Sequence, residues 1–283
     1  MTSTIKKILC PLDFSSVSEN ALRFALQFAD TFNAEIHLLH EIEPAVGITM
    51  DAPHSMPITN TKSIKDAREH LKTLLEKVLT QVSEKLKNEP IFFSDVEIGP
   101  VAVIIHDKAI RMKADLVLMG THDKKHKSWW EGSIASEVLE SPLVPILIVP
   151  EESEYDNIER LSFATNLHRG DLLHLLEVVE FLKPLNPEIR CIHVVEGEKK
   201  KTEIEFDELI QAFSHQIKDI DITFHQLEEE ETTEALEAFN LVYHIDLQIL
   251  VKPRRNFLSA LFHRSQSKKT AQYTHVPLLV MPG

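Results

Sequence analysis

The chain has 283 residues, of which 43% are hydrophobic and 26% are charged, and its formal net charge at pH 7 is −14. This length exceeds one ordinary domain, and the apolar content is enough for a sizeable core. The acidic balance argues against nucleic acid as a partner, because a protein that binds it normally presents a basic face. No apolar run reaches the roughly 18 residues that cross a bilayer, so we expect a cytoplasmic protein without membrane contact.

Two local features of the composition need separate treatment. Cys10 and Cys191 fall in predicted buried strands of different halves, so we expect two reduced core thiols and no disulfide. Basic residues are concentrated over residues 252–269. Two interpretations of this stretch stay open, a solvated loop and helix face or a patch for an anion or an acidic partner.

Short apolar runs alternate with amphipathic helical patterns along the first half of the chain. Uniformly apolar strands that alternate with helices indicate an α/β fold, with a parallel sheet covered on both faces. A proline-bearing loop over residues 44–60 precedes the longest helix. The pattern predicts strands over residues 8–12, 36–39, 91–96, 116–119 and 144–149, and helices over residues 17–32, 61–87, 101–112 and 133–139.

The second half repeats the order of the first. Pro150 and the acidic residues after it mark a boundary. After this boundary the pattern of residues 36–43 recurs in residues 189–196. The pattern of residues 115–120 recurs in the same way in residues 246–251. We therefore expect a tandem duplication with two domains, over residues 1–150 and 151–283.

The segment around Gly120 is the most informative motif. A buried strand ends there, a polar loop follows, and Gly132 and Ser133 open a helix before a last apolar strand. Many sheets present backbone amides to a phosphate in this way. However, Asp123 stands where a second glycine would let the backbone wrap an anion. A carboxylate about 5 Å from a phosphate charge costs roughly 3 kcal/mol at an effective dielectric constant of about 20.

At these motifs the chain resembles the tandem universal stress proteins. The resemblance is carried by residues 8–15, 38–43 and 114–122, and by the Gly-Ser pair before residues 144–145. It covers the first half almost continuously and the second half chiefly through its strand pattern. The resemblance implies two Rossmann-like (adenine nucleotide alpha hydrolase-like) domains, each a five-stranded parallel sheet flanked by helices. In some members ATP binds at the carboxyl ends of the strands, where open α/β sheets usually hold ligands.

The resemblance also implies the residues of a nucleotide site in the first domain. The adenine-contacting aspartate of the family matches Asp13, and its apolar base contact matches Ile42. Met119 and Gly120 match the end of the fourth strand. The start of the last helix, whose free amides and dipole hold phosphate, matches Gly132, Ser133 and Ile134. The binding loop departs from the family pattern, because Asp123 replaces the second glycine and the loop is one residue shorter.

Three functions stay open from the sequence. The first is a stress-response protein that binds ATP through the first domain; Asn166 replaces Asp13 in the second domain, where we expect no nucleotide. The second is an interaction protein in which both sites are degenerate. The third is a small-molecule hydrolase or transferase. We do not expect catalysis or a metal site, because no nucleophile elbow, Cys–His pair or metal-ligand spacing is recognisable.

The family resemblance finally implies a dimer contact in which two closing strands pair across a two-fold axis. For this chain it predicts that residues 144–149 pair antiparallel with residues 276–280, which makes an intramolecular pseudo-dimer and covers two sheet edges. The sequence does not specify the protein partner or a further homodimer. We expect Trp129 and Trp130 to pack beneath their loop, with contact to a nucleotide or a partner as the alternative.

Overall fold

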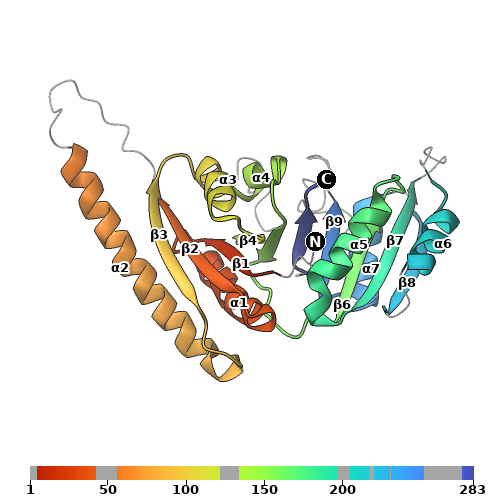
Figure 1. Ribbon diagram of the computed structural model, residues 1–283, viewed down its shortest axis with the longest axis horizontal. Helices are drawn as coiled ribbons and strands as arrows, with labels where there is room; N and C mark the ends of the chain where they lie inside the picture. Colours follow the sequence, from red (N-terminus) through yellow and green to blue (C-terminus); the bar gives the residue numbers. More distant parts are fainter. Residues whose placement is uncertain are drawn as a thin grey trace.

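The computed structural model describes residues 5–42, 56–121, 134–196, 204–216, 220–229, 231–251 and 276–283. Ten strands form one sheet in the order β3-β2-β1-β4-β5-β10-β9-β6-β7-β8, with helices on both faces (Figure 1). We call the chain up to residue 150 the N-terminal half, and the chain from residue 151 onward the C-terminal half. The predicted α/β fold with a mostly parallel sheet is confirmed.

The elements of the N-terminal half are β1 (Lys7–Pro11), α1 (Ser16–Phe32), β2 (Glu35–Ile42), α2 (Met56–Val82), a 3-10 turn (Ser83–Lys85), β3 (Phe92–Ile98), α3 (Val101–Met112), β4 (Leu116–Thr121), α4 (Ile134–Glu140) and β5 (Ile146–Pro150). Those of the C-terminal half are β6 (Arg160–Thr165), α5 (Asp171–Leu182), a 3-10 turn (Lys183–Leu185), β7 (Glu188–Glu196), α6 (Phe206–Gln216), β8 (Ile222–Glu229), α7 (Thr232–Val242), β9 (Leu247–Val251) and β10 (Leu278–Met281).

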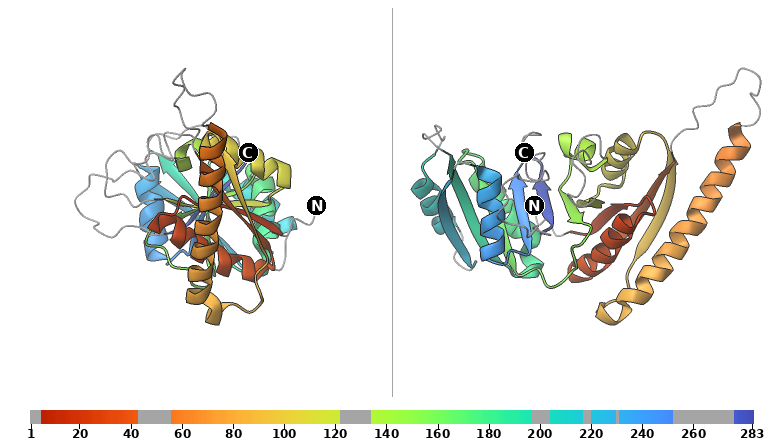
Figure 2. Two further views of the ribbon diagram at one scale, coloured as in Figure 1. Left: turned by 90° about the vertical axis from the view of Figure 1, so that its left-hand side faces the viewer. Right: turned by 180° about the vertical axis from the view of Figure 1, so that it is seen from behind.

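Helix α2 differs from its prediction at both ends. It begins at Met56 instead of residue 61, and it ends at Val82, where a 3-10 turn replaces the last predicted residues. The early start suits Pro57, since proline is tolerated in the first turn of a helix, where its missing N–H has no partner to lose. Helix α2 lies beside β3 along the outer edge of the N-terminal half (Figure 2).

The helices divide the N-terminal core between the two faces of the sheet. Helices α1 and α2 pack with Ile8 and Leu38 on one face, while α3 and α4 pack with Leu9 and Leu39 on the other. This alternation follows from the strand pleat, which sends successive side chains to opposite faces. In β1 and β2, alternate residues therefore contact different pairs of helices: even-numbered residues face α1 and α2, and odd-numbered residues face α3 and α4.

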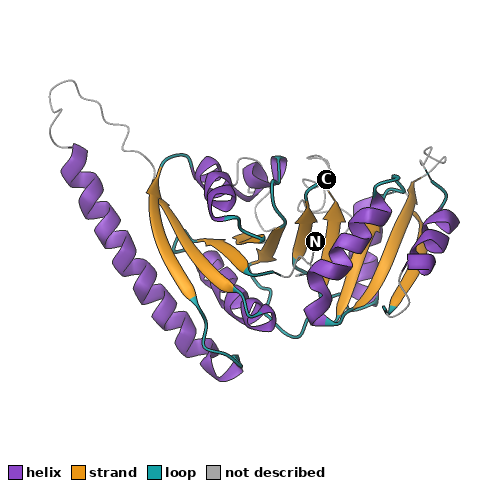
Figure 3. Cartoon of the chain, viewed as in Figure 1, coloured by secondary structure: helices purple, strands orange, loops and turns teal. Residues whose placement is uncertain are grey.

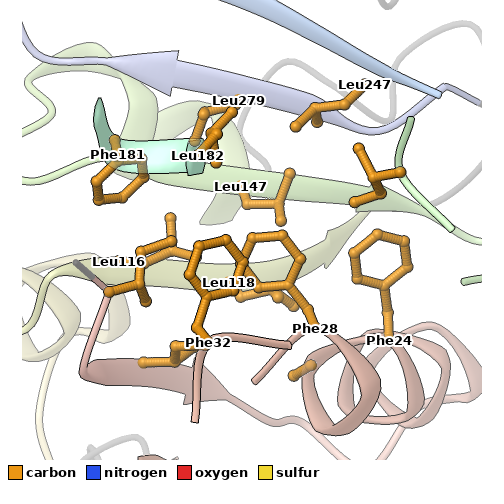
Figure 4. Packing of buried hydrophobic residues seen from close by; sticks show 14 of the residues in the cluster. Phe24, Phe28, Phe32, Leu116, Leu118, Leu147, Phe181, Leu182, Leu247 and Leu279 are labelled. Carbon is orange, nitrogen blue, oxygen red and sulfur yellow. The ribbon is translucent and has the colours of Figure 1, made fainter. Parts of the chain in front are cut away.

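The two halves share one sheet, and the core cluster on each face of the N-terminal half includes residues of the C-terminal half. Strands β5 and β10 pair antiparallel, with Ile146 opposite Val280 and Ile148 opposite Leu278, as the family resemblance implies for the closing strands (Figure 3). On the face of α1, its three phenylalanines point toward leucines of β4 and β5, and Leu279 lies nearby in β10 (Figure 4). Burial of this apolar surface stabilises the junction of the halves.

Several local features recur in the two halves. Asp115, before β4, accepts hydrogen bonds from two consecutive backbone amides at the start of β1, and Asp246, before β9, does the same at the start of β6. Asn33 and Asn186 each adopt the left-handed conformation after a helix, with φ of 49° and 47°. These matched features are consistent with the predicted duplication. The division into two domains stays a prediction.

Candidate functional site

The strand order of the N-terminal half places a switch point between β1 and β4. These strands are parallel neighbours, and the chain leaves β1 toward β2 but leaves β4 toward β5, on the opposite side. Open α/β sheets bind ligands outside the carboxyl ends of the two strands at such a point. Asp13 follows β1 and Gly120 lies near the end of β4, so the structure brings these two predicted site residues to the switch point.

Asp13 is held in its charged form at this edge. Its Oδ1 accepts hydrogen bonds from the backbone amide and the hydroxyl of Ser15, at 3.0 and 2.6 Å. Burial acts to raise the pKa of Asp13, but the hydrogen bonds from Ser15 and Ser18 outweigh it and hold the pKa below its usual value. Ser15 in turn caps α1 by accepting a hydrogen bond from Ser18 N.

A tight backbone turn fixes the position of Asp13. The next residue, Phe14, has a φ of 65°, which is uncommon for a residue other than glycine. Its ring lies 4.2 Å from the ring of His40, centre to centre, and His40 Nδ1 is 2.7 Å from the carbonyl oxygen of Leu12. These contacts keep the turn in its strained conformation and so orient the carboxylate beside it.

Gly120 has a packing reason for being glycine. A Cβ atom there would lie 2.7 Å from both Cγ1 and the carbonyl oxygen of Val17, which is far inside contact distance. The glycine therefore lets the first turn of α1 approach β4 closely. The preceding residue, Met119, is 5% exposed and belongs to the core beneath α3 and α4. Its side chain therefore packs inside the fold.

The end of β2 brings a residue to the site that the sequence interpretation missed. Ile42, the predicted base contact, has the parity of Ile36 and Leu38, which pack on the face of α1 and α2. Glu41 has the parity of Leu39, on the face of α3 and α4. The sequence could have revealed this, since counting alternate positions from Leu38 and Leu39 puts position 41 on the face that carries α4.

Glu41 has an unusual electrostatic environment. Its Oε1 is buried and has no hydrogen-bond partner among the residues that the structure describes. Burial raises the pKa of Glu41 to about 8. A hydrogen bond from its own backbone amide partly opposes this rise, and the charges of Asp13 and Glu97 add smaller increases. The side chain is therefore a neutral carboxylic acid at pH 7, which can both donate and accept a hydrogen bond.

The predicted phosphate cradle is only partly described. Ile134 begins α4 and is 37% exposed. Gly132 and Ser133 lie outside the described residues, as do the loop aspartate at position 123, the tryptophan pair at 129–130 and the basic stretch over 252–269. For these positions the sequence predictions stand without a structural test.

The matching edge of the C-terminal half is occupied by its own side chain. Asp171, at the start of α5, is 7% exposed. One of its oxygens accepts hydrogen bonds from the Thr165 hydroxyl and from the backbone amides of Asn166 and His168, the latter two at 3.2 and 3.1 Å. The backbone amides that follow β6 are therefore already satisfied by an internal carboxylate and are not available to an anion.

The remaining chemical groups in the described ranges offer no further reactive centre. Burial raises the pKa of the thiols of both Cys10 and Cys191, which keeps them protonated and unreactive. No group of three His, Cys, Asp or Glu side chains in the described part of the chain is arranged to hold a metal ion. Of the helices that the structure describes, none has the length and apolar character needed to cross a membrane.

Comparison with known proteins identifies relatives of the N-terminal half. Universal stress protein MJ0531 of Methanocaldococcus jannaschii is 28% identical over 145 residues, which cover 51% of this chain and 81% of that protein. Universal stress protein MJ0577 of the same organism is 26% identical over 162 residues, which cover 54% of this chain and 99% of that protein.

A solved structure extends the likeness to the whole chain. A universal stress protein from Archaeoglobus fulgidus DSM 4304 has a TM-score of 0.67 at 16% identity, and the match covers 98% of this chain and 96% of that chain. At this identity the likeness shows the fold. The model of the universal stress protein family matches residues 4–150, more than half of the 283 residues. The chain therefore belongs to the universal stress protein family.

Proposed function

We propose that the N-terminal half binds an adenine nucleotide, and that the protein acts in the stress response by binding and not by catalysis. The observation that carries the proposal is the position of Asp13, an ionised carboxylate fixed beside the switch point of β1 and β4. A carboxylate is an acceptor only, and it suits the exocyclic amino group of adenine. In this proposal Ile42 contributes backbone atoms of β2 to the part of the site that binds the adenine base.

The phosphate groups belong at the other end of the proposed site. Residues 132 and 133, together with Ile134, would provide free backbone amides at the start of α4. Asp123 opposes an anion in this loop. The lysines at positions 124, 125 and 127 add positive charge that offsets it. The nucleotide then extends from α4 across the end of β1 toward β2. Strands β1 and β2 are adjacent in the strand order.

For the C-terminal half we propose a role without a nucleotide. Asn166 stands where the N-terminal half has Asp13, and the nearby backbone amides bind Asp171. This half then contributes to the shared sheet and to contact with a protein partner. The two halves act as two domains, over residues 1–150 and 151–283, joined as a pseudo-dimer through β5 and β10.

The proposal is tested by the nucleotide content of the purified protein. The protein is released by heat and the supernatant is analysed for adenine nucleotides by mass spectrometry. We expect nucleotide in the wild-type protein, loss of it in Gly132→Asp and no change in the control Gly170→Asp. A wild-type protein that neither carries nor takes up adenine nucleotide contradicts the proposal and favours the interaction protein. Steady ATP hydrolysis would instead favour the enzyme.

A further inference from the structure

Glu41 is a polar residue that the packing of the fold does not explain. Within the described part of the chain its Oε1 is buried without a hydrogen-bond partner, and such buried, unpaired polar atoms are few in native proteins. The side chain as a whole is only partly buried and lies one residue before the end of β2. The carboxyl group is therefore within reach of a ligand at the carboxyl edge of the sheet.

The C-terminal half shows that the fold does not require an acid at this position. In the sequence repeat Glu41 corresponds to Val194, which packs in the apolar cluster of Ile192 and Leu236. Its neighbour across the strand pair, Glu97, corresponds in the same way to Leu227, because Glu41 is opposite Glu97 and Val194 is opposite Leu227. An acid at position 41 is therefore a special feature of the half that has Asp13.

Among the described residues, the charges around Glu41 are paired with one another or are themselves acidic. From β3, Glu97 is held by Lys108 and Arg111 of α3, at 3.4 and 2.7 Å, and Lys108 also binds Asp95. From β1 and its loop, Cys10 and Asp13 interact electrostatically with Glu41. Neither Lys108 nor Arg111 forms an ion pair with Glu41. No cation of α3 therefore favours the ionised form of the Glu41 carboxyl group.

We propose that Glu41 is a specificity-determining residue of the nucleotide site. Its carboxyl group donates a hydrogen bond to a ring nitrogen of adenine, next to the amino group that donates a hydrogen bond to Asp13. This inference rests on the proposed function. A neutral carboxyl has one donor and one acceptor side by side, as adenine has along its amino edge. A base with a carbonyl at that edge, such as hypoxanthine, would place its oxygen against the Asp13 carboxylate.

The proposal predicts a particular pH dependence. Deprotonation of Glu41 removes the donor and adds a negative charge next to Asp13, so the affinity for ATP falls as the pH rises through about 8. Glu41→Gln keeps a donor and an acceptor at every pH. Glu41→Val, which copies the residue of the other half, has neither.

The test is the dissociation constant of ATP measured by calorimetry at about pH 7 and about pH 9.5, on either side of the raised pKa. We expect the wild-type protein to bind about tenfold more weakly at the higher pH, and Glu41→Gln to bind equally at both. Glu41→Val should bind about tenfold more weakly at the lower pH, without further loss. Inosine triphosphate should bind the wild-type protein more weakly than ATP.

The outcomes separate this inference from the proposed function. If the wild-type protein binds ATP and Glu41→Val binds it equally well at both pH values, the role of Glu41 is wrong and nucleotide binding stands. If Glu41→Gln keeps the wild-type pH dependence, the titrating group is another residue and the inference also fails. If the wild-type protein binds no adenine nucleotide, both proposals fail. Thermal melting of the three proteins checks that each variant is folded.

Discussion

The side-chain amide of Asn20 donates a hydrogen bond to the carbonyl oxygen of Ser153 at 2.8 Å, and a second to that of Pro150 at 3.2 Å. Asn20 lies in α1, and the two carbonyls lie where the chain passes from the N-terminal to the C-terminal half. A single side chain thus connects this segment to α1, which buries more hydrophobic residues than any other described helix of the N-terminal half.

Asn20→Ala should destabilise the protein by about 1–3 kcal/mol, because it removes two buried or half-buried hydrogen bonds, although the Pro150 carbonyl still accepts from the Ser153 amide. Urea unfolding measures the loss. Thr73→Ala is the control, since the Thr73 hydroxyl bonds to the Glu69 carbonyl on the exposed side of α2 and should cost less than about 0.5 kcal/mol. Equal effects of the two substitutions would show that Asn20 does not anchor the connection.

Gly120→Ala should destabilise the protein by about 1–3 kcal/mol, because the new methyl group would overlap Val17. The matched control is Gly170→Ala, where the nearest atoms belong to the His174 ring at 3.6 Å and a methyl group fits. Adding Val17→Ala to Gly120→Ala should recover part of the loss, since it removes the Cγ1 contact but not the carbonyl contact. A fully tolerated Gly120→Ala in thermal melts would contradict the close approach of α1 to β4.

Glu41 should also change how stability depends on pH. Its pKa is about 8 in the folded protein and near 4.5 when unperturbed, so between these values the folded state binds more protons than the unfolded state. The stability that this group contributes is therefore lost as the pH rises through that window, by roughly 3–5 kcal/mol in total.

Glu41→Gln removes this dependence. The difference in unfolding free energy between the variant and the wild-type protein should grow in favour of the variant from about pH 5 to about pH 8 and then level off. A difference that stays constant with pH would mean that the Glu41 carboxyl titrates normally.

Asp171→Ala should destabilise the C-terminal half by about 2–4 kcal/mol, because the amides of Asn166 and His168 and the Thr165 hydroxyl all lose a charged acceptor. Hydrogen exchange should locate the effect in the turn between β6 and α5. Glu177→Ala, at an exposed position on the same helix, serves as the control. Unchanged protection of that turn in Asp171→Ala would contradict the assigned network.

The sequence predicts the architecture well because the architecture depends on patterns. Apolar runs such as residues 116–119 mark the strands. The β5–β10 pairing did not follow from these patterns but from the family resemblance. The start of α2 was missed because Pro57 is a turn signal in a loop but is equally compatible with a first helical turn.

The site was less predictable, for a physical reason. A motif fixes which strand end a residue follows, as it does for Asp13 and Gly120, but not which face of the sheet its neighbour occupies. The roles of Glu41 and Ile42 are distinguished by one step of the strand pleat. Similarly, Asp171 has no motif of its own, and only the folded turn shows that its carboxylate takes the amides after β6.

The most direct test of the central claim is a calorimetric titration of nucleotide-free protein with ATP. We predict one ATP per chain, strongly weakened binding in Asp13→Asn and unchanged binding in Asn166→Ala. Asp13→Asn keeps an acceptor for Ser15 and reproduces the residue of the C-terminal half, so the turn should survive. Two ATP molecules per chain, or binding that persists in Asp13→Asn but is lost in Asn166→Ala, would contradict a nucleotide site confined to the N-terminal half.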